Sequence, residues 1–162
     1  MIVTLFSLFL QETGFADSYR EREEVLEKND KIFELYEKSV QHIKKYEWFS
    51  EKAYWDHDRC SIWFGTKAKS CSEKIDYSTA ENRLKEYIDP LVREVMIDFS
   101  DLHTEWQSAL VSFRYNCPRW YNDVKRNGLS RHSLWCKKSW WKVLPWLVKR
   151  RAEENKMIFN TQ

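Results

Sequence analysis

Glycine and proline are scarce in this chain, which contains only three residues of each among 162. β-Sandwiches and barrels need many tight turns, and these two residues supply most of them, so the composition favours helices. Both common glycine-rich phosphate-binding patterns are absent, which excludes the usual nucleotide-binding folds. No Cys-x-x-Cys pair occurs either, and its absence excludes thioredoxin-type redox chemistry and zinc-ribbon ligation.

Apolar and aromatic residues are plentiful by comparison. The hydrophobic share of 43% excludes a disordered chain, and nine Trp supply large, flat apolar side chains. The length is that of one ordinary domain. We therefore expect a single helical domain over residues 18–162, preceded by an apolar segment over residues 1–16.

The apolar segment resembles a short secretory signal. The run from Ile2 to Leu10 is followed by Gly14 and Ala16, small residues at the −3 and −1 positions of a signal-peptidase site. No Lys or Arg precedes the run, and it is far shorter than the ~20 residues of a transmembrane helix. Two interpretations stay open. A cleaved signal predicts a secreted or otherwise extracytoplasmic protein, with the mitochondrial intermembrane space as the alternative, and a retained segment predicts an anchoring helix.

The four cysteines form two pairs that are local in the sequence. We predict the disulfides Cys60–Cys71 and Cys117–Cys136, because each would close a loop between expected helices. Four cysteines allow three connectivities, and four reduced thiols in a cytosolic protein are the alternative.

Helical periodicity is clear in the first half of the chain. Apolar residues over 18–49 recur at steps of three, four or seven, which predicts an amphipathic helix. Ser18 and Glu21 form a capping-box pattern at its start. A second, shorter helix is expected to begin after Ser50 and to run towards Phe64.

The longest apolar stripe predicts the spine of the core. Its steps alternate between three and four, and its members are Leu84, Ile88, Leu91, Val95, Phe99, Leu102, Trp106, Ala109 and Phe113. Pro90 interrupts it, so we expect Asp89 to end one helix and to cap the next. Ser78 and Glu81 provide a capping box before the stripe.

The end of the chain predicts shorter helices. One runs from Pro118 to Asn127, where Gly128 follows, and another begins near Ser130 or Ser133, with Pro145 kinking or restarting it. The predicted fold class is therefore all-α: an antiparallel bundle of three to four long helices with a short, disulfide-tied C-terminal helical hairpin.

Three clusters of polar side chains are candidate sites of chemistry. Asp56, His57 and Asp58 lie near Cys60 and Cys71, but a zinc or acid/base site there would need a further ligand, so an exposed polar segment is the preferred interpretation. A stripe of four carboxylates lacks the Glu-x-x-His pairs of di-iron bundles and predicts a solvated acidic face, or one that faces the basic C-terminal segment; its members are Glu94, Asp98, Asp101 and Glu105. His132 and Cys136 lie four residues apart, but nothing in the sequence orients the imidazole as a base for a thiolate.

Charge is distributed unevenly along the chain. Residues 125–151 carry nine Lys or Arg and no acid, so the rest of the chain has a net charge of −7 against a total of +2. Tryptophan with cationic neighbours suits a protein partner or an anionic membrane surface, and nucleic acid is disfavoured because no RNA-binding motif is present. The alternative is that the Trp side chains pack on the core. The predicted contact residues are Trp135, Lys137, Lys138, Trp140, Trp141, Lys142, Trp146, Lys149 and Arg150.

These patterns predict a binding protein and not an enzyme. We expect a small disulfide-stabilised helical protein that contacts its partner through the basic, Trp-rich C-terminal face, without a metal or another cofactor. The alternative is a structural accessory subunit of a large membrane-bound assembly, with the N-terminal apolar helix retained. A metal-dependent or cysteine-dependent enzyme is the third hypothesis, kept because Asp56, His57 and Cys60 cluster.

Overall fold

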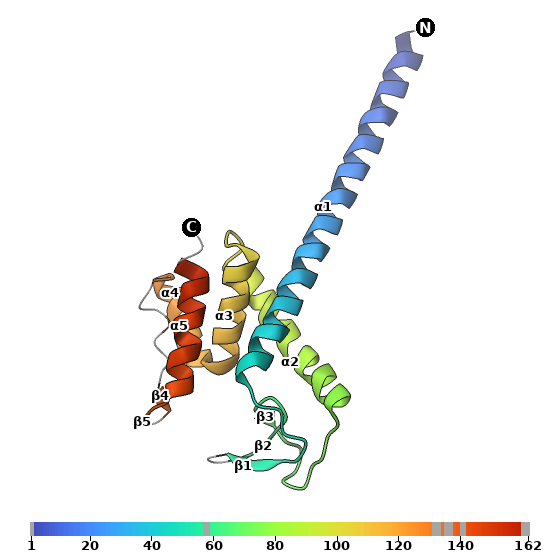
Figure 1. Ribbon diagram of the computed structural model, residues 1–162. Coiled ribbons are helices and arrows are strands. Elements are labelled where there is room, and N and C mark those ends of the chain that lie inside the picture. The colour runs from blue at the N-terminus through green and yellow to red at the C-terminus, as the bar shows by residue number, and fades with distance from the viewer. Residues whose placement is uncertain (1, 57–58, 131–133, 135–137, 140–141, 160–162) are drawn as a thin grey trace. The chain divides into compact units, whose positions relative to one another are not determined.

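The computed structural model describes residues 2–56, 59–130, 134, 138–139 and 142–159, and the side chains of 17–56, 59–130, 134 and 143–159 (Figure 1). The chain divides into two units, Met1–Glu34 and Leu35–Gln162. The helices are α1 (Ile2–Tyr46), α2 (Tyr77–Asp98), α3 (Thr104–Asn116), α4 (Pro118–Asn127) and α5 (Pro145–Phe159). The strands are β1 (Tyr54–Asp56), β2 (Arg59–Ile62), β3 (Thr66–Lys67), β4 (Lys138–Ser139) and β5 (Lys142–Val143).

The helices form most of the second unit, and α3 packs against α2, α4 and α5 (Figure 1). The predicted core stripe is confirmed: its members on α2 and α3 are buried or pack against the core, and those fully buried are Leu84, Ile88, Val95, Ala109 and Phe113. The helix break, however, lies after Asp98 and not at Pro90, which sits inside α2. A proline removes one helical hydrogen bond, and here the burial of residues on both sides of it outweighs that loss.

A three-stranded antiparallel sheet, β1-β2-β3, follows α1. Tyr54 pairs with Ser61 and Asp56 with Arg59 across the first two strands. The helix expected between Ser50 and Phe64 is therefore wrong. The prediction of a mostly helical protein holds, but a purely all-α fold is wrong, and the more specific antiparallel bundle is not confirmed.

Long-range backbone contacts explain why this segment is a sheet. Ala53 N–H donates to Glu73 O at 3.0 Å, and Ile75 N–H donates to Glu51 O at 2.9 Å. These bonds join the start of the sheet to the loop before α2. Strands of two to four residues are too short for periodicity to identify.

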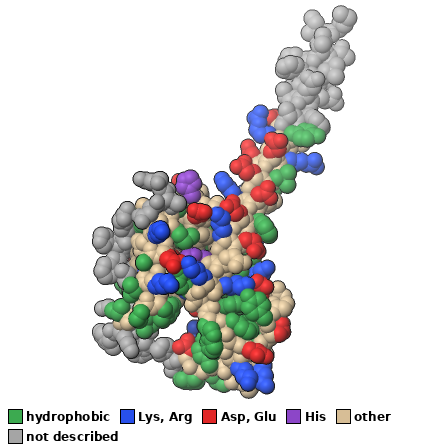
Figure 2. Space-filling model, viewed as in Figure 1, with side chains coloured by type: hydrophobic (Ala, Val, Ile, Leu, Met, Phe, Trp, Pro, Cys, Tyr) green, Lys and Arg blue, Asp and Glu red, His purple; other side chains and the backbone are tan. Residues whose placement is uncertain are grey.

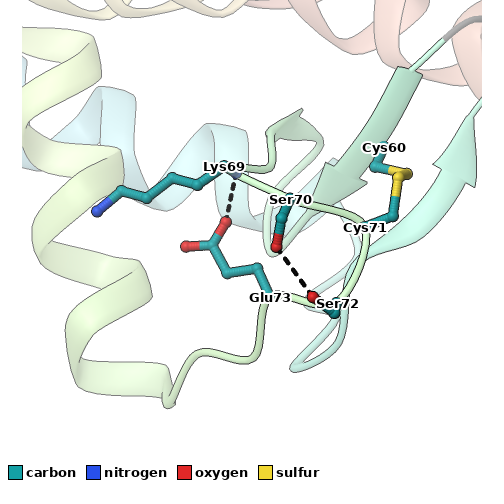
Figure 3. Close-up of a disulfide and its surroundings, with 6 residues drawn as sticks. All are labelled: Cys60, Lys69, Ser70, Cys71, Ser72 and Glu73. Carbon is teal, nitrogen blue, oxygen red and sulfur yellow. Dashed lines mark hydrogen bonds between the residues drawn. A yellow bond between two sulfur atoms is a disulfide. The ribbon is translucent and has the colours of Figure 1, made fainter.

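The disulfide Cys60–Cys71 closes the same loop onto β2, with the two Cα atoms 5.3 Å apart (Figure 3). Beside it, Lys69 N–H donates to the Glu73 carboxylate, which also accepts from Arg83 Nη1 at 2.6 Å. The predicted local pairing is thus present at this loop. Disulfides persist in oxidising compartments, in accord with the predicted extracytoplasmic location, and nothing in the structure favours the mitochondrial alternative.

The C-terminal region differs from the predicted helical hairpin. Helix α4 ends before Gly128, which has a φ of 81°, as expected. Ser130 is not helical, Ser133 lies outside the described residues, β4 and β5 pair antiparallel, and the next helix that the structure describes, α5, begins at Pro145. Cys117 is disulfide-bonded, and its predicted partner Cys136 lies outside the described residues.

Two predicted helix starts are also wrong. Ser18 lies inside α1, which begins at Ile2, and Asp76 caps α2 by accepting from Thr79 N–H at 2.9 Å, in place of the predicted Ser78. Removal or retention of residues 1–16 stays a prediction. Within the described part of the chain, no helix combines the length and the apolarity needed to cross a bilayer.

Candidate active site

Glu47 lies directly after α1, where its N–H still bonds to Ile43 O at 2.9 Å. Its Oε1 is 2.5 Å from Nη1 of Arg150 on α5. The Glu47 side chain is 14% exposed, and that of Arg150 is fully buried. The carboxylate is therefore fixed by an ion pair that joins residues 103 positions apart in the sequence, and it still reaches solvent.

Gly65, in the turn between β2 and β3, makes room for the same carboxylate. Its φ is +81°, and a Cβ placed on it would lie 3.2 Å from Glu47 Oε2. The turn is tight: Trp63 has a φ of 41°, and its carbonyl accepts from Gly65 N–H at 2.6 Å. Glu47 is therefore confined by Arg150 at one oxygen and by backbone at the other.

The β1-β2 hairpin contributes a second carboxylate. Side chains two apart on a strand, and those directly opposite on its neighbour, point to one face, so Tyr54, Asp56, Arg59 and Ser61 share a face. Ser61 Oγ donates to Asp56 Oδ2 at 3.4 Å, a long hydrogen bond. Asp56 is half-buried, whereas Trp55 on the other face is 68% exposed.

The charges of both carboxylates affect Tyr54, which shares its strand face with Asp56. Burial raises the pKa of its hydroxyl, and the negative charges of Asp56 and Glu47 raise it further, against a smaller opposing effect of Arg59. Asp56 lies on the same strand as Tyr54, and Glu47 lies directly after α1, so the charges of both carboxylates influence this residue.

A second tyrosine approaches from α3. Tyr115 donates its hydroxyl to Phe64 O at 2.7 Å, which fixes the turn that carries Gly65. Burial raises the pKa of Tyr115, and the charge of Glu47 adds to this effect. The helical part of the unit and the sheet thus meet around Glu47.

Aromatic rings flank the carboxylates. Trp48 follows Glu47, is 73% exposed, and has its ring centroid 6.0 Å from that of Tyr54. A cavity of about 470 Å³ opens beside them, lined by Lys44, Lys45, Tyr46, Glu47, Trp48, Phe49, Phe64 and Tyr77. Its lining combines aromatic rings with two lysines and the carboxylate of Glu47, so it offers both stacking surfaces and charged groups to a ligand.

The hypotheses of a metal-dependent or a cysteine-dependent enzyme find no support at the predicted cluster. Cys60 is bonded to Cys71 and is no thiolate. His57 and Asp58, like His132 and Cys136, lie outside the described residues. Among the residues that the structure does describe, no group of three or more His, Cys, Asp or Glu is arranged to hold a metal ion.

The predicted contact surface is described only in part. Trp146 and Lys149 are exposed on α5, as a surface role requires. Arg150 is fully buried against two carboxylates, so its assignment to the surface was wrong. Trp135, Lys137, Trp140 and Trp141 lie outside the described residues, as do the side chains of Lys138 and Lys142, and their role in binding stays a prediction.

Three of the four carboxylates in the acidic stripe form ion pairs. Asp98 lies 2.6 Å from Lys125, Glu94 lies 2.8 Å from Arg114, and Glu105 lies 3.0 Å from Lys38. Figure 2 shows charges of both signs mixed over the visible face of the second unit. The expected separate acidic face is therefore a surface of paired charges. Of these three pairs, only that of Asp98 with Lys125 involves the basic C-terminal segment.

Sequence reasoning missed Glu47 and Ser61 and placed Asp56 in a different kind of site. One signal was available: Tyr54 and Asp56 lie two residues apart, as on one face of a strand, and Glu47 precedes them. This signal is visible only if residues 54–62 are interpreted as a β-hairpin. Arg150 carried no such signal, because its charge alone predicts exposure.

No known protein family matches the chain, and no curated protein matches it. Solved structures do. The muramidase domain of SpmX from Asticaccaulis excentricus has a TM-score of 0.62 at 22% identity, covering 75% of this chain and 94% of that one. The endolysin from Escherichia coli O157:H7 phage FAHEc1 has a TM-score of 0.60 at 21% identity, covering 77% and 92%.

This similarity shows that the chain has the fold of those two enzymes. It overturns the prediction of a non-enzymatic binding protein and the alternative of an accessory subunit, because these two similar structures are a muramidase domain and an endolysin. The prediction that the chain is not an enzyme was wrong for the same reason.

Proposed function

We propose that this protein is a glycoside hydrolase that cleaves the glycan strands of peptidoglycan. The observation that carries the proposal is the carboxylate of Glu47, which Arg150 holds beside the turn at Gly65, together with Asp56 on the β1-β2 hairpin. The fold supports it, since similar solved structures bear the names muramidase and endolysin. Glycosidases of most families use two carboxyl groups that flank the scissile bond.

Glu47 is the proposed general acid. Protonated, it gives its proton to the glycosidic oxygen as the bond from that oxygen to the anomeric carbon breaks, and the leaving sugar departs as an alcohol. Its small exposure and its ion pair with Arg150 hold the carboxyl group in one position. A fixed donor is what proton transfer in the transition state requires.

Asp56 is the proposed second carboxylate. Its negative charge stabilises the positive charge that develops on the sugar ring, and water supplies the hydroxyl group of the new reducing end. Ser61, which donates to Asp56, holds that carboxylate on the shared face of the hairpin. The exposed Trp48 ring offers an apolar surface for a sugar ring beside the acids.

The test is hydrolysis of purified peptidoglycan, followed by the appearance of new reducing ends. We expect Glu47→Gln and Asp56→Asn to lower kcat by about 10²-fold or more, because each removes a group that acts in the transition state. Glu51→Gln is the matched control, since Glu51 is an exposed glutamate four residues from Glu47.

Two results would overturn the proposal. One is wild-type protein that releases no reducing ends, or that releases amino groups in their place, which would indicate cleavage of a peptide or amide bond. The other is a folded Glu47→Gln protein with the activity of the Glu51→Gln control.

A further inference from the structure

Three charged side chains are completely buried behind Glu47: Arg150, Arg151 and Glu154, all on α5. Burying an ion is costly unless partners replace its water. Only Arg150 reaches Glu47, so the proposed chemistry does not account for the other two. Their contacts show what they do for Arg150.

Glu154 holds both arginines. Its Oε1 accepts from Arg151 Nη2 at 2.8 Å and from Arg150 Nε at 3.3 Å, and its Oε2 lies 2.7 Å from Arg151 Nε. Ser112 on α3 joins the cluster: its hydroxyl lies 2.6 Å from Glu154 Oε1, and its carbonyl accepts from Arg150 Nη2 at 3.2 Å. The guanidinium of Arg150 is thus held at Nε and Nη2, which leaves Nη1 for Glu47.

Charge balance gives Glu154 a second effect. Arg150 and Arg151 bring two positive charges, and Glu47 and Glu154 together can bring two negative ones. Burial raises the pKa of the Glu154 carboxyl group, and the charges of Arg151 and Arg150 and the hydrogen bond from Ser112 oppose that effect. Without Glu154, Arg151 would lose its carboxylate partner, and Glu47 would be the one carboxylate left to Arg150 among the described ion pairs. The charged and titratable groups near Glu47 are Arg150 and Arg151 of α5, Lys44, Lys45 and Tyr46 of α1, Tyr54 of β1 and Tyr115 of α3.

His42 of α1 does not change this balance near neutral pH. Its Nε2 lies 4.0 Å from Glu154 Oε1. Burial and the neighbouring Arg150 lower the pKa of His42 to about 4, so the imidazole is neutral. Glu154 is therefore the carboxylate that compensates the two arginines from behind the site.

We propose that Glu154 is a positioning residue, which fixes Arg150 so that its Nη1 aims at Glu47 and supplies a negative charge beside the two arginines behind that carboxyl group. This inference rests on the proposed function of Glu47. It assigns to a buried residue, remote from the substrate, control over the pH range of the reaction.

The experiment compares Glu154→Gln with Glu153→Gln. Glu153 is the adjacent glutamate, which pairs with Lys45 and does not contact Arg150 in the ion pairs of the described residues. We expect Glu154→Gln to lower kcat about tenfold, to leave KM within about twofold, and to move the alkaline limb of the pH–kcat profile to lower pH. Glu154→Asp, which retains the charge, should restore that limb, and Glu153→Gln should behave as wild type.

Two further measurements keep the inference testable apart from activity and from misfolding. Carbon-13 NMR titration of the Glu47 carboxyl should show its midpoint at lower pH in Glu154→Gln than in wild type. Ser112→Ala keeps all four charges and removes one support, so it should lower kcat without moving the pH profile.

The outcomes separate the two proposals. A Glu47 titration midpoint that is the same in wild type and folded Glu154→Gln overturns the role of Glu154, even if the protein cleaves peptidoglycan. A shifted midpoint in a protein without glycosidase activity supports the role of Glu154 and overturns the proposed function alone. If Glu154→Gln does not fold, a folded Ser112→Ala protein with wild-type kcat overturns the positioning role.

Discussion

Gly65 provides a sharp test of the site, because a single methyl group there meets Glu47. Gly65→Ala would place a Cβ 3.2 Å from Glu47 Oε2, closer than most carbon–oxygen contacts. The carboxylate cannot simply turn away, since Arg150 holds its other oxygen at 2.5 Å. We therefore expect a displacement of a few tenths of an ångström at the proposed proton donor.

We expect Gly65→Ala to lower both the stability and the activity, by different amounts. Forcing a side chain into positive φ costs about 1–3 kcal/mol, which in a protein of this length lowers the melting temperature by about 2–4 °C per kcal/mol. Activity should fall further than folding explains. A misplacement of 1 Å costs on the order of 10²-fold in rate, so a smaller shift should cost about tenfold in kcat per folded molecule.

Gly128→Ala is the matched control. Gly128 has the same φ of +81°, and nothing lies within 4 Å of the Cβ that it would gain. Both variants should therefore lose stability, and only Gly65→Ala should lose activity on peptidoglycan. Equal kcat values for the two variants, measured well below their melting temperatures, would refute the placement of Glu47 against this turn.

The remaining predictions concern the surface and the disulfide. Trp48→Ala should raise KM for peptidoglycan about fivefold, corresponding to roughly 1 kcal/mol of lost ring contact, whereas the equally exposed Trp55→Ala should not; equal KM values would remove Trp48 from the binding surface. Replacing both Cys60 and Cys71 with Ser should lower the free energy of unfolding by about 3 kcal/mol, because the bond closes a loop over a sequence separation of 11. Urea denaturation measures this loss, and an unchanged midpoint would show that the loop is held by its other contacts.

Local patterns in the sequence were sufficient for much of the helical part. The spacing from Leu84 to Phe113 predicted which residues fill the core, since a helix places every third or fourth residue on one face. Gly128 marked the end of α4, and the short distance between Cys60 and Cys71 in the sequence predicted their bond. Each of these features depends on residues that are neighbours along the chain.

Tertiary contacts decided the sheet and the candidate site. The strands are stabilised by bonds such as that between Ala53 and Glu73, which periodicity over a few residues does not report. Arg150 was placed on the surface because isolated charges prefer water, yet Glu47 and Glu154 together replace that water in the interior. The sequence by itself thus determined which helix faces are buried and that Cys60 bonds to Cys71. The placement of Glu47, Asp56 and Arg150 was decided by the tertiary structure, because their surroundings arise only when distant segments pack together.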